Sequence, residues 1–326
     1  MDSQYLQRQR FQLQKRMRKL NSCSKLFFHS SLIQFWGFLN ESPLFGGVLQ
    51  KLRAEAPALE QEVDSVMNGT TFRLHETESE ALHFALRLIE QCVALPLEAN
   101  RNVAMPEVQI GIMLLRHADG EDELDQFRET YLEPIYEYLD DALDRQVAAL
   151  SLLIKYRQRV EWFRRSETGA LGAKGERALV VDLYAYLHDQ GLDFSIEPRG
   201  PSGIPDLVSK ELVLDAKLFD ADARGKTYIA HGVHQVHTYL VEFSQIAGYL
   251  VIYRTCPEKL HFSFATPDSL VPFLHVGGKV IYFLVIDICD YEASASKRGT
   301  MKEYLIDDAF VIRAATEPTD VVPTSP

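Results

Sequence analysis

The sequence predicts an α/β fold with a central mixed sheet flanked by helices, preceded by an all-α domain. Helical periodicity dominates from about residue 25 to residue 165. After residue 166 the order is helix, hairpin, helix and strand, which is typical of a small α/β domain. At 326 residues the chain is longer than a typical single domain. We therefore expect a helical domain at 1–165, an α/β domain at 166–313 and a disordered tail at 314–326.

The first domain is predicted from apolar residues that recur at helical spacing. Ala81, Phe84, Leu88 and Cys92 share one face of a helix in "ESEALHFALRLIEQCVAL". The segment from Tyr131 to Phe163 indicates one or two further long helices. No repeat and no nucleotide-binding glycine pattern occurs in this half, so its role is predicted only as regulatory or partner-binding.

Charge is distributed unevenly along a chain whose net charge is −12. No acidic residue lies between Ser3 and Asn40, where the basic residues are Arg8, Arg10, Lys15, Arg16, Arg18, Lys19 and Lys25. The next hundred residues are acidic, most of all "DGEDELD" at 119–125. The basic N-terminal segment is compatible with a phosphate-binding arm, and equally with the solvated face of a helix.

Composition excludes several other classes of protein. The apolar fraction is 46% and the charged fraction is 25%, as in ordinary globular proteins. The four cysteines are scattered without a CxxC pair, which fits a reducing cytoplasm better than a disulfide framework. The longest apolar run, Val280 to Ile288, is too short to cross a bilayer. We expect a cytoplasmic protein with no membrane partner.

The second domain is predicted from a helix at about 174–189 followed by short apolar runs. Leu179, Val180, Leu183 and Leu187 form the apolar stripe of this helix, and Glu176 lies on the same stripe. A carboxylate on an inward face has to be paired, protonated or bound to a metal. The alternative is that Glu176 is a first-turn acid favoured by the helix dipole. The predicted strands are "DFSI", "IPDLV", "ELVLDAKLF", "GYLVIY" and "KVIYFLVIDI", and a helix at about 231–243 lies between the third and fourth.

Acidic residues interrupt the hairpin "GIPDLVSKELVLDAKLF". Strand alternation places Asp215 and Lys217 on one face. If Ser209 and Lys210 form a two-residue turn, Asp206 is diagonal to Asp215, about 7–8 Å away at Cα. Two such carboxylates share a divalent cation, or one of them stays protonated. The plainer alternative is an edge hairpin in which Lys217 only neutralises Asp215.

This arrangement resembles the PD-(D/E)XK nuclease superfamily, which has the restriction-endonuclease-like fold. The matching residues are Pro205-Asp206 and Asp215-Ala216-Lys217, with Glu176 in the preceding helix and Gln235 in the following one. The resemblance covers about a quarter of the chain at the level of motifs. It implies a restriction-endonuclease-like core, with Asp215 standing where the family more often has glutamate.

The resemblance also implies roles for these residues. Asp206, Asp215 and the Ala216 carbonyl would bind Mg²⁺ or Mn²⁺, and Glu176 would bind a second metal or orient its water. Lys217 would hold or deprotonate the attacking water and stabilise the developing negative charge. Glu176, Asp206, Asp215, Lys217 and Gln235 are therefore the expected catalytic residues.

The helix after the hairpin has His231, Gln235 and Tyr239 on one face. In the family this glutamine points toward the active site, so we expect His231 and Tyr239 beside it to contact the phosphate or sugar of the substrate. His231, His234 and His237 do not favour zinc, because they fan around the helix and no cysteine or acidic pair joins them.

The resulting hypothesis is a metal-dependent DNA endonuclease. The resemblance associates such proteins with prokaryotic anti-phage defence or restriction. The acidic net charge suggests control by a protein partner or by homo-oligomerisation through the helical domain. "YRQRVEWFRR" at 156–165 is interpreted either as a DNA-contacting helix or as an interdomain helix with solvated arginines. Two alternatives stay open: a non-catalytic nucleic-acid-binding or scaffold protein on a nuclease fold, and an RNA-directed nuclease.

Overall fold

The computed structural model divides the chain into two compact units, Leu6–Asp144 and Arg145–Pro326 together with Met1–Tyr5. The division lies inside one long helix, about twenty residues before the boundary predicted from the sequence. The structure describes residues 3–56, 58–69, 75–95, 105–115, 122–200, 203–209, 212–221, 225–265, 271–291 and 302–317.

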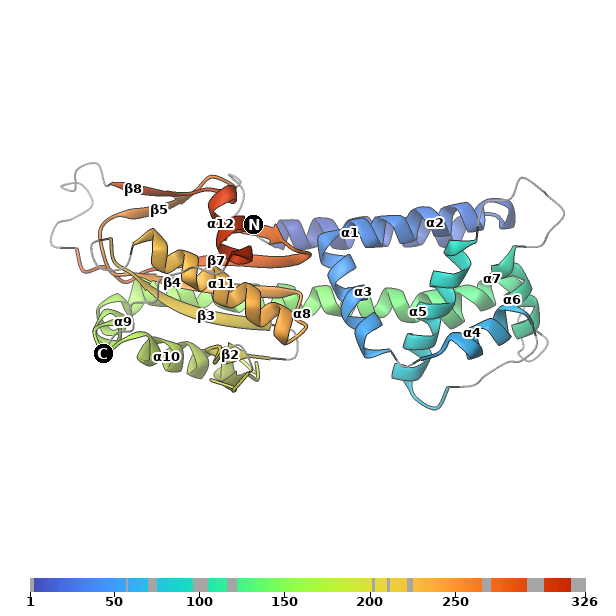
Figure 1. Ribbon diagram of the computed structural model, residues 1–326, viewed down its shortest axis with the longest axis horizontal. Coiled ribbons are helices and arrows are strands. Elements are labelled where there is room, and N and C mark those ends of the chain that lie inside the picture. Colours follow the sequence, from blue (N-terminus) through green and yellow to red (C-terminus); the bar gives the residue numbers. More distant parts are fainter. Residues whose placement is uncertain are drawn as a thin grey trace. The chain divides into compact units, whose positions relative to one another are not determined.

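The first unit is helical throughout its described part, as predicted (Figure 1). Its elements are α1 Ser3–Ser22, α2 Lys25–Glu41, α3 Pro43–Glu55, α4 Glu60–Met67, α5 Glu78–Ala94, α6 Pro106–Leu115, α7 Glu123–Phe127, the π-helical turn η1 Arg128–Leu132 and the start of α8 Glu133–Phe163. The predicted apolar face of α5 is in the core, where Phe84, Leu88 and Cys92 are almost fully buried.

The basic N-terminal segment is a packed helix in this unit. Leu6, Leu13 and Leu20 of α1 are buried. Arg10 lies 2.7 Å from Asp140 and 2.6 Å from Asp144. These contacts neutralise part of the basic charge within the unit, and favour the solvated helix face over a free phosphate-binding arm.

The second unit is α/β. Its helices are the end of α8, α9 Arg165–Gly172, α10 Glu176–Asp189, α11 Lys226–Glu242 and α12 Asp308–Thr316. Its strands are β1 Ser195–Ile196, β2 Leu207–Val208, β3 Leu212–Phe219, β4 Ala247–Arg254, β5 Lys259–Phe262, β6 Phe273–Val276, β7 Lys279–Asp287 and β8 Glu303–Ile306. Residues 166–172 form most of α9. Helix α12 continues beyond residue 313, and the rest of the predicted tail, from 318, lies outside the described residues.

The predicted mixed sheet is confirmed. Six strands follow the order β1-β2-β3-β4-β7-β6, and β5 and β8 form a separate two-stranded sheet. The pairs β3–β4 and β4–β7 are parallel, whereas β1–β2, β2–β3 and β6–β7 are antiparallel. The three central parallel strands therefore end at one edge of the sheet.

Helices cover both faces of this sheet (Figure 1). On one face Val213 and Phe219 of β3 join Val233 and Val236 of α11 in a single apolar cluster. On the other face the buried Tyr156 of α8 lies 3.1 Å, hydroxyl to hydroxyl, from Tyr253 of β4. Because side chains alternate along a strand, Asp215 and Lys217 lie on the α11 face.

Within the described ranges, no helix combines the length and the hydropathy needed to cross a bilayer.

Candidate carboxylate and lysine site

The site is built on the part of β3 that β2 leaves uncovered. The pairing of β2 with β3 consists of Leu207 with Leu214 and Val208 with Val213. Beyond it, the Ala216 N–H donates to Asp206 Oδ2 at 2.7 Å, and the Leu218 N–H donates to Glu176 Oε1 at 2.7 Å. Two carboxylates thus take the place of a neighbouring strand and are held at the open edge of the sheet.

The register differs from the predicted one. The Ser209 N–H donates to the Leu212 carbonyl at 2.9 Å, and Ser209 Oγ accepts from the Leu212 N–H at 3.1 Å. The turn therefore follows Ser209 rather than including it, and residues 210 and 211 lie outside the described residues. Continued by one residue, the ladder places Asp206 directly opposite Asp215 instead of diagonal to it. Directly opposite residues share a face and are closer than diagonal ones.

Asp215 and Lys217 form a buried ion pair. Lys217 Nζ lies 2.6 Å from Asp215 Oδ2, and only 6% and 3% of the two residues are exposed. Lys217 Nζ also donates to the Ala216 carbonyl at 3.3 Å. Gly232 of α11 makes room for the lysine, since a Cβ at this position would lie 3.0 Å from Lys217 Cγ. Asp215 Oδ2 accepts no hydrogen bond of normal geometry from the described residues.

Glu176 is positioned by the turn before α10. Gly175 has φ +107°, a conformation that favours glycine, so the helix begins sharply at Glu176. Besides the strand amide, Glu176 accepts hydrogen bonds from the Tyr228 hydroxyl, at 2.7 Å to Oε1 and 2.8 Å to Oε2. Sequence reasoning missed Tyr228, because the start of α11 was expected several residues later.

Burial and mutual repulsion raise the pKa values of the carboxyl groups of Asp206 and Asp215. Burial, followed by the nearby Asp215 carboxylate, raises the pKa of Asp206 to about 7, although the Ala216 N–H and Lys217 oppose the change. Burial also raises the pKa of Asp215, against the effect of Lys217. Burial alone would lower the pKa of Lys217, but the carboxylates of Asp215, Glu176 and Asp206 together raise it. Lys217 is therefore a cation.

Residues of α11 approach the cluster to different degrees. Gln235 hydrogen-bonds Tyr239, whose pKa is raised by burial and by the Asp215 carboxylate. Tyr239 is only 3% exposed and belongs to the apolar core, so its ring approaches the carboxylates from within the protein. His231 is partly buried on the same helix, and no described contact joins it to the carboxylates.

The carboxylates of the site are the side chains that the sequence predicted as metal ligands. Within the described ranges, no group of three or more His, Cys, Asp or Glu side chains is arranged to hold a metal ion. Both oxygens of Glu176 already accept hydrogen bonds, which leaves Asp206 and Asp215 as the two facing carboxylates. Fully ionised, three carboxylates and one lysine carry a net charge of −2. A divalent cation beside Asp206 and Asp215 would balance it, so the donor set fits Mg²⁺ or Mn²⁺.

Known proteins offer no independent assignment of this site. Comparisons with protein-family models, with curated proteins and with solved structures found no match to the chain.

Proposed function

We propose that the α/β unit is a metal-dependent nuclease of the PD-(D/E)XK type that hydrolyses phosphodiester bonds of DNA. The observation that carries the proposal is the pair Asp206 and Asp215, which face one another at an open strand edge with Lys217 beside them. Hard carboxylate oxygens in a cluster of net charge −2 suit a divalent cation that keeps several of its waters.

In this proposal Asp206, Asp215 and the Ala216 carbonyl hold the metal, which supplies an activated water and neutralises charge on the scissile phosphate. Lys217 acts as a fixed positive charge near the reacting oxygens, because its raised pKa keeps it protonated. Glu176 acts through its hydrogen bonds, which hold the edge of β3 in place. This division of roles differs from the expectation that Glu176 binds a second metal or orients its water, and that Lys217 holds or deprotonates the attacking water.

An aromatic surface at the end of α8 is a suitable contact for DNA. Trp162 and Phe163 are 77% and 79% exposed, so both rings are open to a partner. Rings of this kind stack on bases. Arg164 contributes less, because its guanidinium is paired with Glu167 and Asp182. The DNA-contacting interpretation of 156–165 thus depends on the aromatic residues more than on the arginines.

The helical unit is proposed as the controlling part, acting through a protein partner or a second copy of the chain. Leu26 and Phe27 at the start of α2 are 66% and 60% exposed, and Phe11 of α1 is 57% exposed. An apolar surface suits a protein partner better than DNA. A role as the effector of prokaryotic anti-phage defence or restriction, in the cytoplasm, completes the proposal, and the four cysteines, none of which forms a disulfide, fit that compartment.

A non-catalytic role is the second candidate, and one observation favours it. Asp206 and Glu176 satisfy the edge amides of Ala216 and Leu218, while Lys217 neutralises Asp215, so the cluster has a purely structural use in sealing the sheet edge. The chain would then bind nucleic acid or a partner without cleaving it. The third candidate, an RNA-directed nuclease, uses the same chemistry on another substrate.

One assay separates these candidates. The full-length protein is incubated with supercoiled plasmid, single-stranded DNA and RNA in the presence of Mg²⁺, Mn²⁺ or EDTA. Asp206→Asn is the test variant, because asparagine keeps an oxygen that can accept from the Ala216 N–H. Asp189→Asn, at an exposed position at the end of α10, is the control. We expect metal-dependent loss of DNA with the wild type and the control only. Cleavage of RNA alone would select the third candidate, and cleavage unaffected by Asp206→Asn would reject the site.

A further inference from the structure

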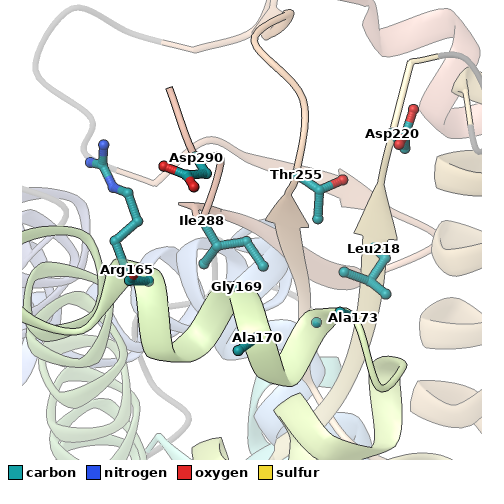
Figure 2. Close-up of a pocket in the computed structure, with 11 residues that line it drawn as sticks. Arg165, Gly169, Ala170, Ala173, Leu218, Asp220, Thr255, Ile288 and Asp290 are labelled. Atoms are coloured by element: carbon teal, nitrogen blue, oxygen red, sulfur yellow. The ribbon is translucent and has the colours of Figure 1, made fainter. Parts of the chain in front are cut away.

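A cavity of about 560 Å³ lies in the α/β unit, and no residue of the carboxylate and lysine site lines it. It is bounded by α9 and by the segments that directly follow β3, β4 and β7 (Figure 2). Leu218 points into it, and since neighbouring side chains alternate, Lys217 points to the other face of the sheet. The cavity and the carboxylate and lysine site therefore lie on opposite faces of β3.

Its position is one where ligands bind in open α/β sheets. Strands β3, β4 and β7 are parallel neighbours, and Asp220, Thr255 and Ile288 come at the carboxyl end of each. Crevices outside the carboxyl ends of parallel strands are common sites for small molecules. The volume also lies within the usual range of ligand pockets, roughly 300–1,000 Å³.

Small residues on α9 create the space. A Cβ on Gly172 would lie 3.1 Å from Ile288 Cδ1, and a Cβ on Gly169 would lie 3.3 Å from the Ile288 carbonyl oxygen. The glycines thus let α9 approach the strand ends closely. Ala170 and Ala173 are exposed and line the same cavity, so a longer side chain at either position would fill it.

The polar groups lie at the two ends of an apolar wall. Figure 2 shows Arg165 and Asp220 at opposite ends, with Asp290 near the Arg165 end and Leu218, Thr255 and Ile288 between the two ends. From residue 165 to residue 173 the helix rises about 12 Å, at roughly 1.5 Å per residue. The cavity is therefore elongated, and a ligand that fills it has different chemistry at its two ends.

Arg165 is available to an anionic group. The carboxylate of Asp287 lies 3.9 Å away and is held more tightly by Arg254 at 2.8 Å and by the Tyr291 hydroxyl at 2.9 Å. The buried Nε of Arg165 makes no hydrogen bond with any described residue. A guanidinium in this situation suits a phosphate, with which it forms two parallel hydrogen bonds.

The rest of the cavity suits a nucleoside. At the end opposite Arg165, the carboxylate of Asp220 accepts hydrogen bonds from hydroxyl or amino groups, as acidic residues at strand ends do with ribose. Leu218, Ile288 and the alanines of α9 provide an apolar wall for a flat ring. A mononucleotide carries both kinds of group, with an anionic phosphate at one end and hydroxyl or amino groups at the other.

We propose that this cavity binds a nucleotide, with its phosphate at Arg165 and its sugar or base at Asp220. The nucleotide is either free or the terminal unit of a nucleic-acid strand. The site shares no ligand-contacting side chain with the carboxylate and lysine site, so nucleotide binding does not require that the chain cleave DNA.

The test is isothermal titration calorimetry of the full-length protein with ribonucleoside and deoxyribonucleoside monophosphates in EDTA, so that the result is independent of cleavage. Adenosine, inorganic phosphate and a 5′-phosphorylated oligonucleotide are titrated separately. We expect at least one monophosphate or the oligonucleotide to bind, and adenosine and phosphate to bind about tenfold more weakly or worse, since each lacks part of the contacts. The oligonucleotide and the monophosphates distinguish a strand end from a free nucleotide.

Three variants make the test specific. Ala173→Leu should abolish binding by filling the cavity, and Arg165→Ala should weaken it about tenfold or more. Lys174→Leu, at the next exposed position and outside the cavity, should bind as the wild type does. If Ala173→Leu does not fold, judged by its melting curve, Arg165→Ala and Asp220→Asn replace it. No binding of any nucleotide at millimolar concentration, equal binding of phosphate alone, or wild-type affinity in the cavity variants would overturn the proposal.

Discussion

The substitution Asp206→Asn should reduce the dependence of stability on pH. In the folded protein without metal, burial and Asp215 raise the pKa of Asp206 from 3.8 to about 7. The folded state therefore holds a proton that the unfolded state has released, and stability falls as pH rises through the folded pKa. For one group with these values, the free energy of unfolding drops by about 2.5 kcal/mol between pH 5 and pH 8.

Asparagine cannot ionise, so this contribution is absent in the variant. Its side-chain oxygen can still accept from the Ala216 N–H, which limits other changes. The assay is urea unfolding at pH 5 and pH 8 in EDTA, for the wild type, Asp206→Asn and the exposed control Asp189→Asn. We expect the variant to lose about 2.5 kcal/mol less than the other two over this range. An identical pH dependence in all three would refute the argument that Asp206 is buried beside a second carboxylate.

The same experiment with metal tests the function of the cluster. A cation at one hundred times its Kd stabilises the folded state by about 2.7 kcal/mol. At pH 8, Mg²⁺ should stabilise the wild type and the control but not Asp206→Asn. Equal stabilisation of all three proteins would place the metal elsewhere.

Three further predictions concern the packing of the site. Gly232→Ala should destabilise the protein by roughly 1–3 kcal/mol in urea unfolding, because the new Cβ would lie 2.7 Å from a leucine methyl group of β4. The control is Gly37→Ala, which should be neutral or stabilising because a Cβ there would have no atom within 4 Å. Lys217→Ala should cost roughly 3–5 kcal/mol by leaving Asp215 buried and unpaired, and adding Asp215→Asn should restore part of it; full stability of the single variant would contradict the buried pair. Tyr228→Phe should cost about 1.5–3 kcal/mol by removing a donor to the carboxylate at the start of α10, and an unchanged urea midpoint would count against that contact.

Much of the second unit was predictable because its helices and strands show characteristic residue spacing within short stretches of the sequence. The apolar stripe of α10, the alternation along β3 and the order of the two helices around the hairpin all follow from spacing in the sequence. They predicted that Glu176, Asp206, Asp215 and Lys217 lie together. In the structure the carboxylates of Asp206 and Glu176 accept from neighbouring amides of β3, and Lys217 pairs with Asp215. The nuclease chemistry stays a prediction, because it came from a resemblance that the comparisons do not test.

The hairpin register was predicted wrongly, and three strands and the cavity were not predicted, because they depend on contacts that the spacing of residues in the sequence does not reveal. The hairpin register is set by Ser209, which bonds Leu212 through both its main chain and its side chain, and whose carbonyl accepts from Gln245 at 3.0 Å. Strands β5, β6 and β8 were missed because their short sequences gain stability only from their partners. The cavity beside α9 has no motif at all, since its lining comes from four separated parts of the chain.

The central claim is that Asp206 and Asp215 hold a divalent cation at the open edge of β3. Crystals of the full-length protein soaked in Mn²⁺ and measured near the manganese absorption edge test it most directly. The account predicts an anomalous peak about 2.0–2.2 Å from oxygens of both carboxylates, since octahedral cations of this size bind oxygen at such distances. Clear density for both side chains with no peak between them, while Lys217 keeps its ion pair with Asp215, would contradict it.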